Sequence, residues 1–112
     1  MTAVQLATLI EESNVLLVLF KSPTCNKCSF RYNNMMNDET LAKHLVEFDA
    51  SSALDVCSEL NIVAVPTLIC FSNWKEMFRF EEAQPNDVIL TKIKETEWID
   101  LTSTLNHEMR QW

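Results

Sequence analysis

The sequence predicts an α/β domain in which α-helices flank a central mixed β-sheet. Apolar residues recur at helical spacing in some segments and form short strand-like runs in others, in the order α-β-α-β-α-β-β-α. The 112 residues, of which 47% are hydrophobic, are enough for one core and too few for two. A Cys-x-x-Cys pair, Cys25 and Cys28, follows the first long apolar run. These features predict one domain with a thiol pair beyond the end of a strand.

The N-terminal segments predict a helix and a central strand. Residues 2–13 carry an apolar stripe on one helical face, and Thr2 can cap the first turn. The stripe consists of Val4, Leu6, Leu9 and Ile10. Residues 15–20 form a continuous β-branched and aliphatic run, which is typical of a strand buried on both faces of a sheet. We therefore place residues 15–20 at the centre of the sheet.

A helix, a second strand and another helix follow the turn-like residues 21–24. Helical spacing begins at Cys25 and restarts or continues as far as Leu45. Residues 46–50 alternate apolar and polar side chains as a strand does, and we expect Ser51 or Ser52 to cap the next helix. That helix carries Leu54, Cys57 and Leu60. Parallel strands joined by a crossover helix follow from this order.

The remaining segments predict a hairpin and a final helix. Residues 67–71 form a buried-type run after Pro66, and residues 76–80 alternate, so we expect the two strands to pair antiparallel. A helix is expected from about residue 86 to residue 98, capped by Asn86 or Asp87. The chain contains no glycine, so its turns must depend on Asn, Asp, Ser and Pro.

Composition limits the partners and the compartment. Sixteen acidic and nine basic residues give a net charge of −7, which disfavours nucleic acid and anionic membranes as partners. The apolar run at residues 15–20 is far shorter than the roughly 20 residues of a membrane span. No basic stretch opens the chain as it would in a signal peptide. We therefore expect a cytoplasmic protein that binds neither nucleic acid nor membrane.

The Cys25-Asn26-Lys27-Cys28 segment is the candidate for chemistry. Cys25 stands at the start of a predicted helix, where unpaired N–H groups and the helix dipole stabilise a thiolate and so lower the pKa of Cys25. The thiolate is the nucleophile in disulfide exchange, and Cys28 lies one turn further on, close enough to close a disulfide. We expect Cys25 to attack a substrate disulfide and Cys28 to resolve the mixed disulfide.

Over about residues 3–98 the chain resembles the thioredoxin family. The resemblance is carried by the strand-like run before the cysteines, the Cys-x-x-Cys segment, residues 46–49, and Val65-Pro66-Thr67 before the next strand. It implies the thioredoxin fold and dithiol–disulfide oxidoreductase activity on protein disulfides, with no cofactor and with a thioredoxin-reductase-like electron donor. It also implies that Pro66 is a cis-proline facing the cysteines, and that the backbone of Val65 pairs with a substrate segment.

Several positions depart from the thioredoxin pattern. Thr24 replaces the usual Trp, Asn26-Lys27 replaces Gly-Pro, and Leu19 replaces the buried Asp that assists proton transfer. Trp74 stands where the family has a hairpin glycine. The Gly-Gly pair with which the neighbouring glutaredoxins hold glutathione is also missing, which disfavours glutathione. These departures indicate a divergent member with its own reductase or substrate, of the kind that a phage or plasmid encodes.

Other charged and sulfur-containing residues have both a functional and a plain interpretation. Lys27 can lower the pKa of Cys25 through its positive charge, or it is a solvated side chain; Lys21 is a weaker candidate for the same role. Cys57 and Cys70 are too unevenly spaced to complete a zinc site with the Cys-x-x-Cys pair. We expect both to pack in the core, and the protein to bind no metal.

The chain is expected to comprise a domain at residues 1–98 and a helical extension at residues 99–112. The extension carries an apolar stripe at i, i+4 spacing, formed by Leu101, Leu105 and Met109. We expect the stripe to pack on the domain of a monomer, with docking to a partner as the alternative.

For the whole chain, the main alternative to an oxidoreductase is a redox-independent adaptor that binds proteins through the surface of the fold. A zinc-binding structural protein is the third candidate.

Overall fold

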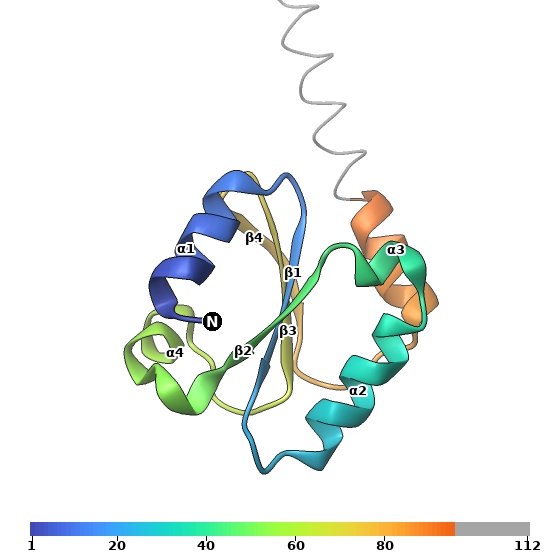
Figure 1. The fold of residues 1–112 in the computed structure, drawn as a ribbon. Coiled ribbons are helices and arrows are strands. Elements are labelled where there is room, and N and C mark those ends of the chain that lie inside the picture. Colours follow the sequence, from blue (N-terminus) through green and yellow to red (C-terminus); the bar gives the residue numbers. More distant parts are fainter. Residues whose placement is uncertain (96–112) are drawn as a thin grey trace, which may run out of the picture.

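The computed structural model describes residues 1–95, which form a four-stranded sheet with helices on both faces (Figure 1). The strands are β1 (Leu16–Lys21), β2 (Leu45–Asp49), β3 (Thr67–Ser72) and β4 (Lys75–Phe80). Helices α1 (Ala3–Glu12) and α4 (Leu54–Leu60) cover one face, and the short 3-10 helix η1 (Ala50–Ser52) joins β2 to α4. The other face is covered by α2 (Asn26–Met36), α3 (Glu39–Ala42) and a C-terminal helix at residues 86–95 (Figure 1).

The sheet has the order β2-β1-β3-β4 and is mixed, as predicted. β1 pairs parallel with β2 on one side and antiparallel with β3 on the other, so Leu17 lies between Leu45 and Cys70. β3 and β4 form the expected antiparallel hairpin, with an irregularity between Cys70 and Phe71. The crossover from β1 to β2 through α2 and α3 confirms the parallel pair that the order of elements predicts.

The sheet divides the buried apolar residues into two clusters, one on each face. Alternate side chains of β1 enter opposite clusters, as a central strand requires. The cluster beneath α1 and α4 consists of Leu6, Leu16, Val18, Phe20, Phe48, Ala50, Ala53, Ile69 and Phe71. The cluster beneath α2, α3 and residues 86–95 consists of Leu17, Leu19, Met35, Leu41, Leu45, Leu68, Cys70, Ile89 and Ile93. The sheet therefore divides the single core that the sequence predicts into two buried clusters within one domain.

The predicted helical stretch from Cys25 to Leu45 is two helices, which corrects its far end. The carboxylate of Asp38 accepts hydrogen bonds from the backbone N–H groups of Thr40 (2.9 Å) and Leu41 (3.1 Å) and so starts α3 afresh. Leu45 is not helical but begins β2, where it faces Leu17 of the central strand. The side-chain cap at Asp38 competes with continuation of α2, so the break follows from local hydrogen bonding.

The predicted serine cap after β2 is wrong. Ala50 already belongs to η1, whose first turn is capped by Asp49 through a hydrogen bond from Ser51 N–H (2.9 Å). α4 begins after Ala53, which has no side-chain acceptor to offer. The predicted caps of the last helix, Asn86 and Asp87, are likewise wrong, because both residues lie inside its first turn. Asn86 donates its side-chain amide to the carbonyl of Asn34 (2.9 Å). At α1 the expected cap is confirmed, because Thr2 Oγ1 accepts from Gln5 N–H (3.1 Å).

Three residues in the described part of the chain adopt positive φ angles, although none of them is glycine. Asn61 (φ 55°) ends α4, whereas Asn73 (φ 50°) and Trp74 (φ 75°) form the β3–β4 turn. Asparagine tolerates this region, but tryptophan does not favour it. Arg79 of β4 holds the end of α4 by donating to the carbonyls of Leu60 (2.7 Å) and Asn61 (3.3 Å). The chain is thus anchored just before the loop that leads to Pro66.

The last residues of the expected final helix, 96–98, and the extension at residues 99–112 lie outside the described residues. None of the helices within residues 1–95 combines the length and the apolar character that crossing a membrane requires.

Candidate functional site

Cys25 and Cys28 lie at the N-terminus of α2, directly after the loop that follows β1. Cys25 is the residue that caps the helix, with an extended backbone (φ −88°, ψ 99°), and its N–H donates to the carbonyl of Ser22 (3.2 Å). Its Sγ accepts a hydrogen bond from the N–H of Cys28 at 3.1 Å. The two residues form a disulfide, with their Cα atoms 5.3 Å apart, within the usual range for such a bond. The helix start therefore brings both sulfurs together.

The two sulfur-bearing residues differ in exposure. Cys25 is partly exposed, whereas Cys28 is only 1% exposed and lies on the buried face of α2. An incoming sulfur can therefore reach Cys25 from solvent more readily than Cys28. This asymmetry is what a nucleophilic thiol and a resolving thiol require.

The loop before β3 places Val65 and Pro66 beside the start of α2. The Val65–Pro66 peptide bond is cis, as the family resemblance implies. The hydroxyl of Thr67, which is 1% exposed, donates to the carbonyl of Ala64 at 2.7 Å and ties the residues on either side of this peptide together. Val65 and Pro66 are both partly exposed, so they offer backbone and side-chain surface to a bound segment.

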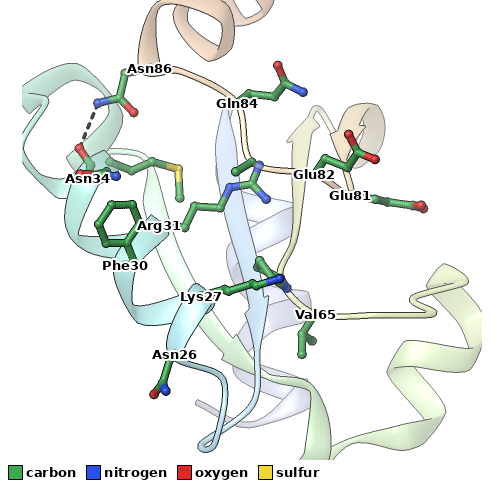
Figure 2. Close-up of a pocket in the computed structure, with 13 residues that line it drawn as sticks. Asn26, Lys27, Phe30, Arg31, Asn34, Val65, Glu81, Glu82, Gln84 and Asn86 are labelled. Carbon is green, nitrogen blue, oxygen red and sulfur yellow. Dashed lines mark hydrogen bonds between the residues drawn. The ribbon is translucent and has the colours of Figure 1, made fainter.

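A groove of about 770 Å³ runs between α2 and the loops opposite it (Figure 2). α2 contributes Asn26, Lys27, Phe30, Arg31, Asn34 and Met35 to its walls. The remaining wall is formed by Val65, Pro66, residues 81–84 and Asn86. Phe30, an apolar side chain at the edge of the groove, is 71% exposed. The site is thus an open groove that begins next to the disulfide.

The two lysines that could tune Cys25, Lys27 and Lys21, lie in different surroundings. Lys27 is exposed, and Figure 2 shows its side chain extending from α2 toward the loop that carries Val65. Lys21 forms an ion pair with Glu47, and the hydrogen bond between the two side chains raises the pKa of Lys21. Its charge is thus engaged by Glu47. Leu19 is fully buried in the apolar cluster beneath α2, so this position supplies no carboxylate to the site.

Sequence reasoning did not identify Arg31. It is 4% exposed, it shares the buried face of α2 with Cys28 and Met35, and burial lowers the pKa of its guanidinium. The signal that could have found it is positional: the helical spacing 28, 31, 35 assigns residue 31 to the face that packs inward, where a charged residue is unusual. The acidic and amide residues at 81–84 were also missed, because only the fold brings this loop to α2.

The other two cysteines are in separate places. Cys70 is buried in β3, as predicted, and Cys57, which is partly buried on α4, packs against the cluster beneath α1 and α4 and donates its thiol to the carbonyl of Ala50 at 3.5 Å. Burial, followed by the negative charge of Asp55, raises the pKa of Cys57. Within residues 1–95, no three His, Cys, Asp or Glu side chains gather as they would around a metal ion.

Comparison with known proteins finds a matching family model and a related protein. The family model for Thioredoxin matches residues 2–95. A candidate protein disulfide-isomerase of Schizosaccharomyces pombe is 31% identical over 86 residues, which cover 73% of this chain. The chain spans only 18% of the length of that relative.

Solved thioredoxin structures share the fold. A mutant thioredoxin from Halobacterium salinarum aligns with a TM-score of 0.70 at 20% identity, covering 80% of each chain. Oxidised mitochondrial thioredoxin 3 from Saccharomyces cerevisiae aligns with a TM-score of 0.69 at 16% identity, covering 81% of this chain and 88% of the other. The family match extends over nearly all the described residues and includes both cysteines and Pro66. The chain belongs to the thioredoxin family.

Proposed function

We propose that the protein is a thiol–disulfide oxidoreductase that acts on protein disulfides through Cys25 and Cys28. The observation that carries the proposal is the closed disulfide at the N-terminus of α2, at the head of a groove that Val65 and Pro66 help to form. Membership of the thioredoxin family and similarity to a candidate disulfide-isomerase support the same chemistry.

The reaction proceeds in two exchanges that transfer two electrons. In the reduced protein, the Cys25 thiolate attacks one sulfur of the substrate disulfide; the substrate S–S bond breaks, a mixed disulfide forms, and the first substrate thiol leaves. Cys28 then loses its proton and attacks Cys25 in the mixed disulfide, which closes the Cys25–Cys28 bond and releases the second thiol. The protein dithiol is oxidised and the substrate disulfide is reduced, with two protons ending on the substrate sulfurs.

The roles of the neighbouring residues follow from their positions. The helix start stabilises the Cys25 thiolate through the N–H of Cys28, and the nearby charge of Lys27 favours the same ionised form. Val65 pairs its backbone with an extended segment of the substrate, and Pro66 shapes the surface against which that segment lies. The effect of Lys27 on the thiolate is small, because its charge is exposed to solvent.

The partners are disulfide-bonded proteins and, for regeneration, a thioredoxin-reductase-like electron donor. We propose that the protein works as a cytoplasmic monomer without a cofactor. Because Leu19 supplies no carboxylate, we expect water or the substrate to accept the proton of Cys28. We therefore expect slow resolution of the mixed disulfide compared with family members that keep an Asp at this position.

Leu19 also favours the second candidate function, a redox-independent adaptor. A family member that has lost its buried base and the Trp before its first cysteine has lost two features that serve exchange, while the groove and Phe30 remain available for docking. In that case the disulfide would be a structural cross-link at the start of α2 rather than a reacting group.

Redox equilibration of the full chain separates the two functions. The protein is incubated in dithiothreitol or glutathione buffers of stepped potential, its thiols are alkylated, and the adduct masses are counted. The oxidoreductase proposal predicts a reversible two-electron transition of Cys25 and Cys28, with a midpoint in the range of −120 to about −270 mV where working exchange couples lie. A Cys57→Ser variant should show the same transition. No reversible transition, or a bridge that resists reduction throughout the series, contradicts the proposal and favours the adaptor.

A further inference from the structure

Arg31 is a buried cation without a hydrogen-bond partner in the described part of the chain. The residue is 4% exposed, and its Nε, Nη1 and Nη2 atoms all lack an acceptor within residues 1–95. Buried arginines are ordinarily paired, because a charge removed from water must be compensated by an anion or by hydrogen bonds. The guanidinium is therefore a strong donor group with unused capacity.

Arg79, the other arginine within residues 1–95, shows what a satisfied guanidinium looks like in this fold. It forms an ion pair with Glu76 and donates to the carbonyls of Leu60 and Asn61 at the end of α4. Arg79 is thus fully used in holding the architecture together. Arg31 has no comparable structural role, although it occupies a more deeply buried position.

Arg31 faces the groove in which the proposed substrate lies. Its side chain extends from α2 toward the segment at residues 81–84, across the middle of the groove (Figure 2). It stands one turn after Cys28 on the same face of α2, and residues at this spacing have Cβ atoms about 5–6 Å apart. A ligand that reaches the disulfide and also lies along α2 in the groove therefore comes close to the guanidinium.

We propose that Arg31 binds a carboxylate of the docked substrate, so that the protein prefers disulfides with an acidic group close to the reactive cysteine. The proposal rests on the proposed function and names its substrate class. A guanidinium presents its donors in a planar fork that matches the two oxygens of a carboxylate. Glu81 and Glu82 line the same groove, and their like charge favours a singly charged carboxylate over a doubly charged phosphate.

The spacing of side chains in an extended segment assigns a position in the substrate to the carboxylate. In an extended segment, side chains on one face recur at every second residue, about 7 Å apart. With the substrate cysteine over Cys25, the residue two positions away lies on the same face, and we assign the carboxylate that Arg31 binds to that residue. An aspartate at that position, or a chain terminus that ends there, supplies the carboxylate.

Matched peptide disulfides test this assignment. Two amidated peptides carry a single cysteine with either Asp or Asn two positions away on both sides, and each is used as its oxidised dimer. The reduced full-length protein is mixed with each dimer at low ionic strength, and the rate of Cys25–Cys28 oxidation is followed by acid quench, alkylation and mass. The net charge of −7 alone predicts that the Asp peptide reacts more slowly. The proposal predicts the opposite order, with the Asp peptide faster by about tenfold, the scale of one charge-assisted hydrogen-bonded pair.

Three variants isolate the guanidinium. Arg31→Met should abolish the preference for the Asp peptide over the Asn peptide, and Arg31→Lys should retain part of the preference. Lys43→Met, which removes an exposed cation outside the groove, should leave the preference intact. A third peptide, with Asn and a free C-terminus two residues after the cysteine, distinguishes a terminal carboxylate from a side chain as the favoured group.

The outcomes separate this inference from the proposed function. Equal rates in the wild-type protein, or a slower Asp peptide, overturn the role of Arg31 and would fit pairing of its side chain with Glu81 or Glu82 instead. A preference that survives Arg31→Met, or a loss of rate that is equal for both peptides, also overturns it. If neither peptide oxidises the protein, it is the oxidoreductase function itself that fails. The wild-type comparison stands even if a variant does not fold.

Discussion

The N–H of Cys28 donates a hydrogen bond to Sγ of Cys25 at 3.1 Å, so the exposed sulfur of the pair caps the helix that carries the buried one. This relationship predicts that, in the reduced protein, Cys25 reacts first. We expect limiting iodoacetamide at neutral pH to label Cys25 well before Cys28, because Cys25 is both more accessible and closer to the helix N-terminus. Peptide mapping by mass measures the order. Equal labelling, or preferential labelling of Cys28, would contradict it.

The carboxylate of Asp49 predicts a specific pH dependence of stability. The hydroxyl and N–H of Ser51 both donate to Oδ1 (2.6 and 2.9 Å), and the hydroxyl hydrogen bond is the main reason that the pKa of Asp49 lies below its ordinary 3.8. A depressed folded pKa stabilises the protein above pH 3.8, and this contribution is lost as the pH falls through the lower value. Asp49→Asn should therefore lower the urea midpoint at neutral pH, and the difference from wild type should shrink on acidification.

The same titration of Asp87→Asn, which removes an exposed carboxyl at the last helix, provides the control for the loss of one negative charge. A difference between wild type and Asp49→Asn that stays constant from neutral pH to about pH 2.5 would show that the carboxylate of Asp49 is not responsible.

Trp74 predicts a stabilising substitution. Its φ of 75° places a residue with a Cβ atom in the left-handed region, and its side chain is 65% exposed, so little packing is lost on its removal. Trp74→Gly should raise the free energy of unfolding by about 1 kcal/mol, measured by urea denaturation. Trp74→Ala, which removes the same indole but keeps Cβ, should give less of this gain. An equal gain from Ala and Gly would show that the backbone angle is not the cause.

The burial of Arg31 predicts that replacing it stabilises the protein while weakening recognition of the substrate. Because its guanidinium is buried without a partner in the described chain, Arg31→Met should raise the free energy of unfolding by about 1 kcal/mol or more. Urea midpoints of the full chain measure this, with Lys43→Met as the control for charge. A clear loss of stability in Arg31→Met would mean that the side chain has a structural partner, and it would weaken the case for a ligand.

The elements and the reactive pair could be predicted from the sequence because their signals are local. The run from Val15 to Phe20 has no polar interruption, and it forms a central strand from Leu16 onward. The Cys-x-x-Cys pair and Val65-Pro66 are short motifs whose meaning depends on the elements around them, and both stand in the expected context. Periodicity and motif spacing are sufficient for features of this kind.

The errors arose where a single side chain decides between alternatives. Asp38 restarts a helix that apolar spacing would continue, and the serines expected to cap α4 lie instead in the short helix η1, which Asp49 caps. These outcomes depend on which acceptor a free N–H meets first, and periodicity carries no information on that. The groove escaped prediction for a different reason: the loop at residues 81–84 and α2 are far apart in sequence and meet only in the folded chain.

Capture of a mixed disulfide tests the central claim most directly. The reduced Cys28→Ser variant is mixed with an oxidised peptide dimer and examined by mass under non-reducing conditions, beside Cys25→Ser and the wild-type chain. The proposed mechanism predicts a stable one-to-one adduct on Cys25 in Cys28→Ser, no adduct in Cys25→Ser, and full conversion to the Cys25–Cys28 disulfide in the wild type. An adduct that forms equally well in Cys25→Ser, or none in Cys28→Ser, would contradict nucleophilic attack by Cys25.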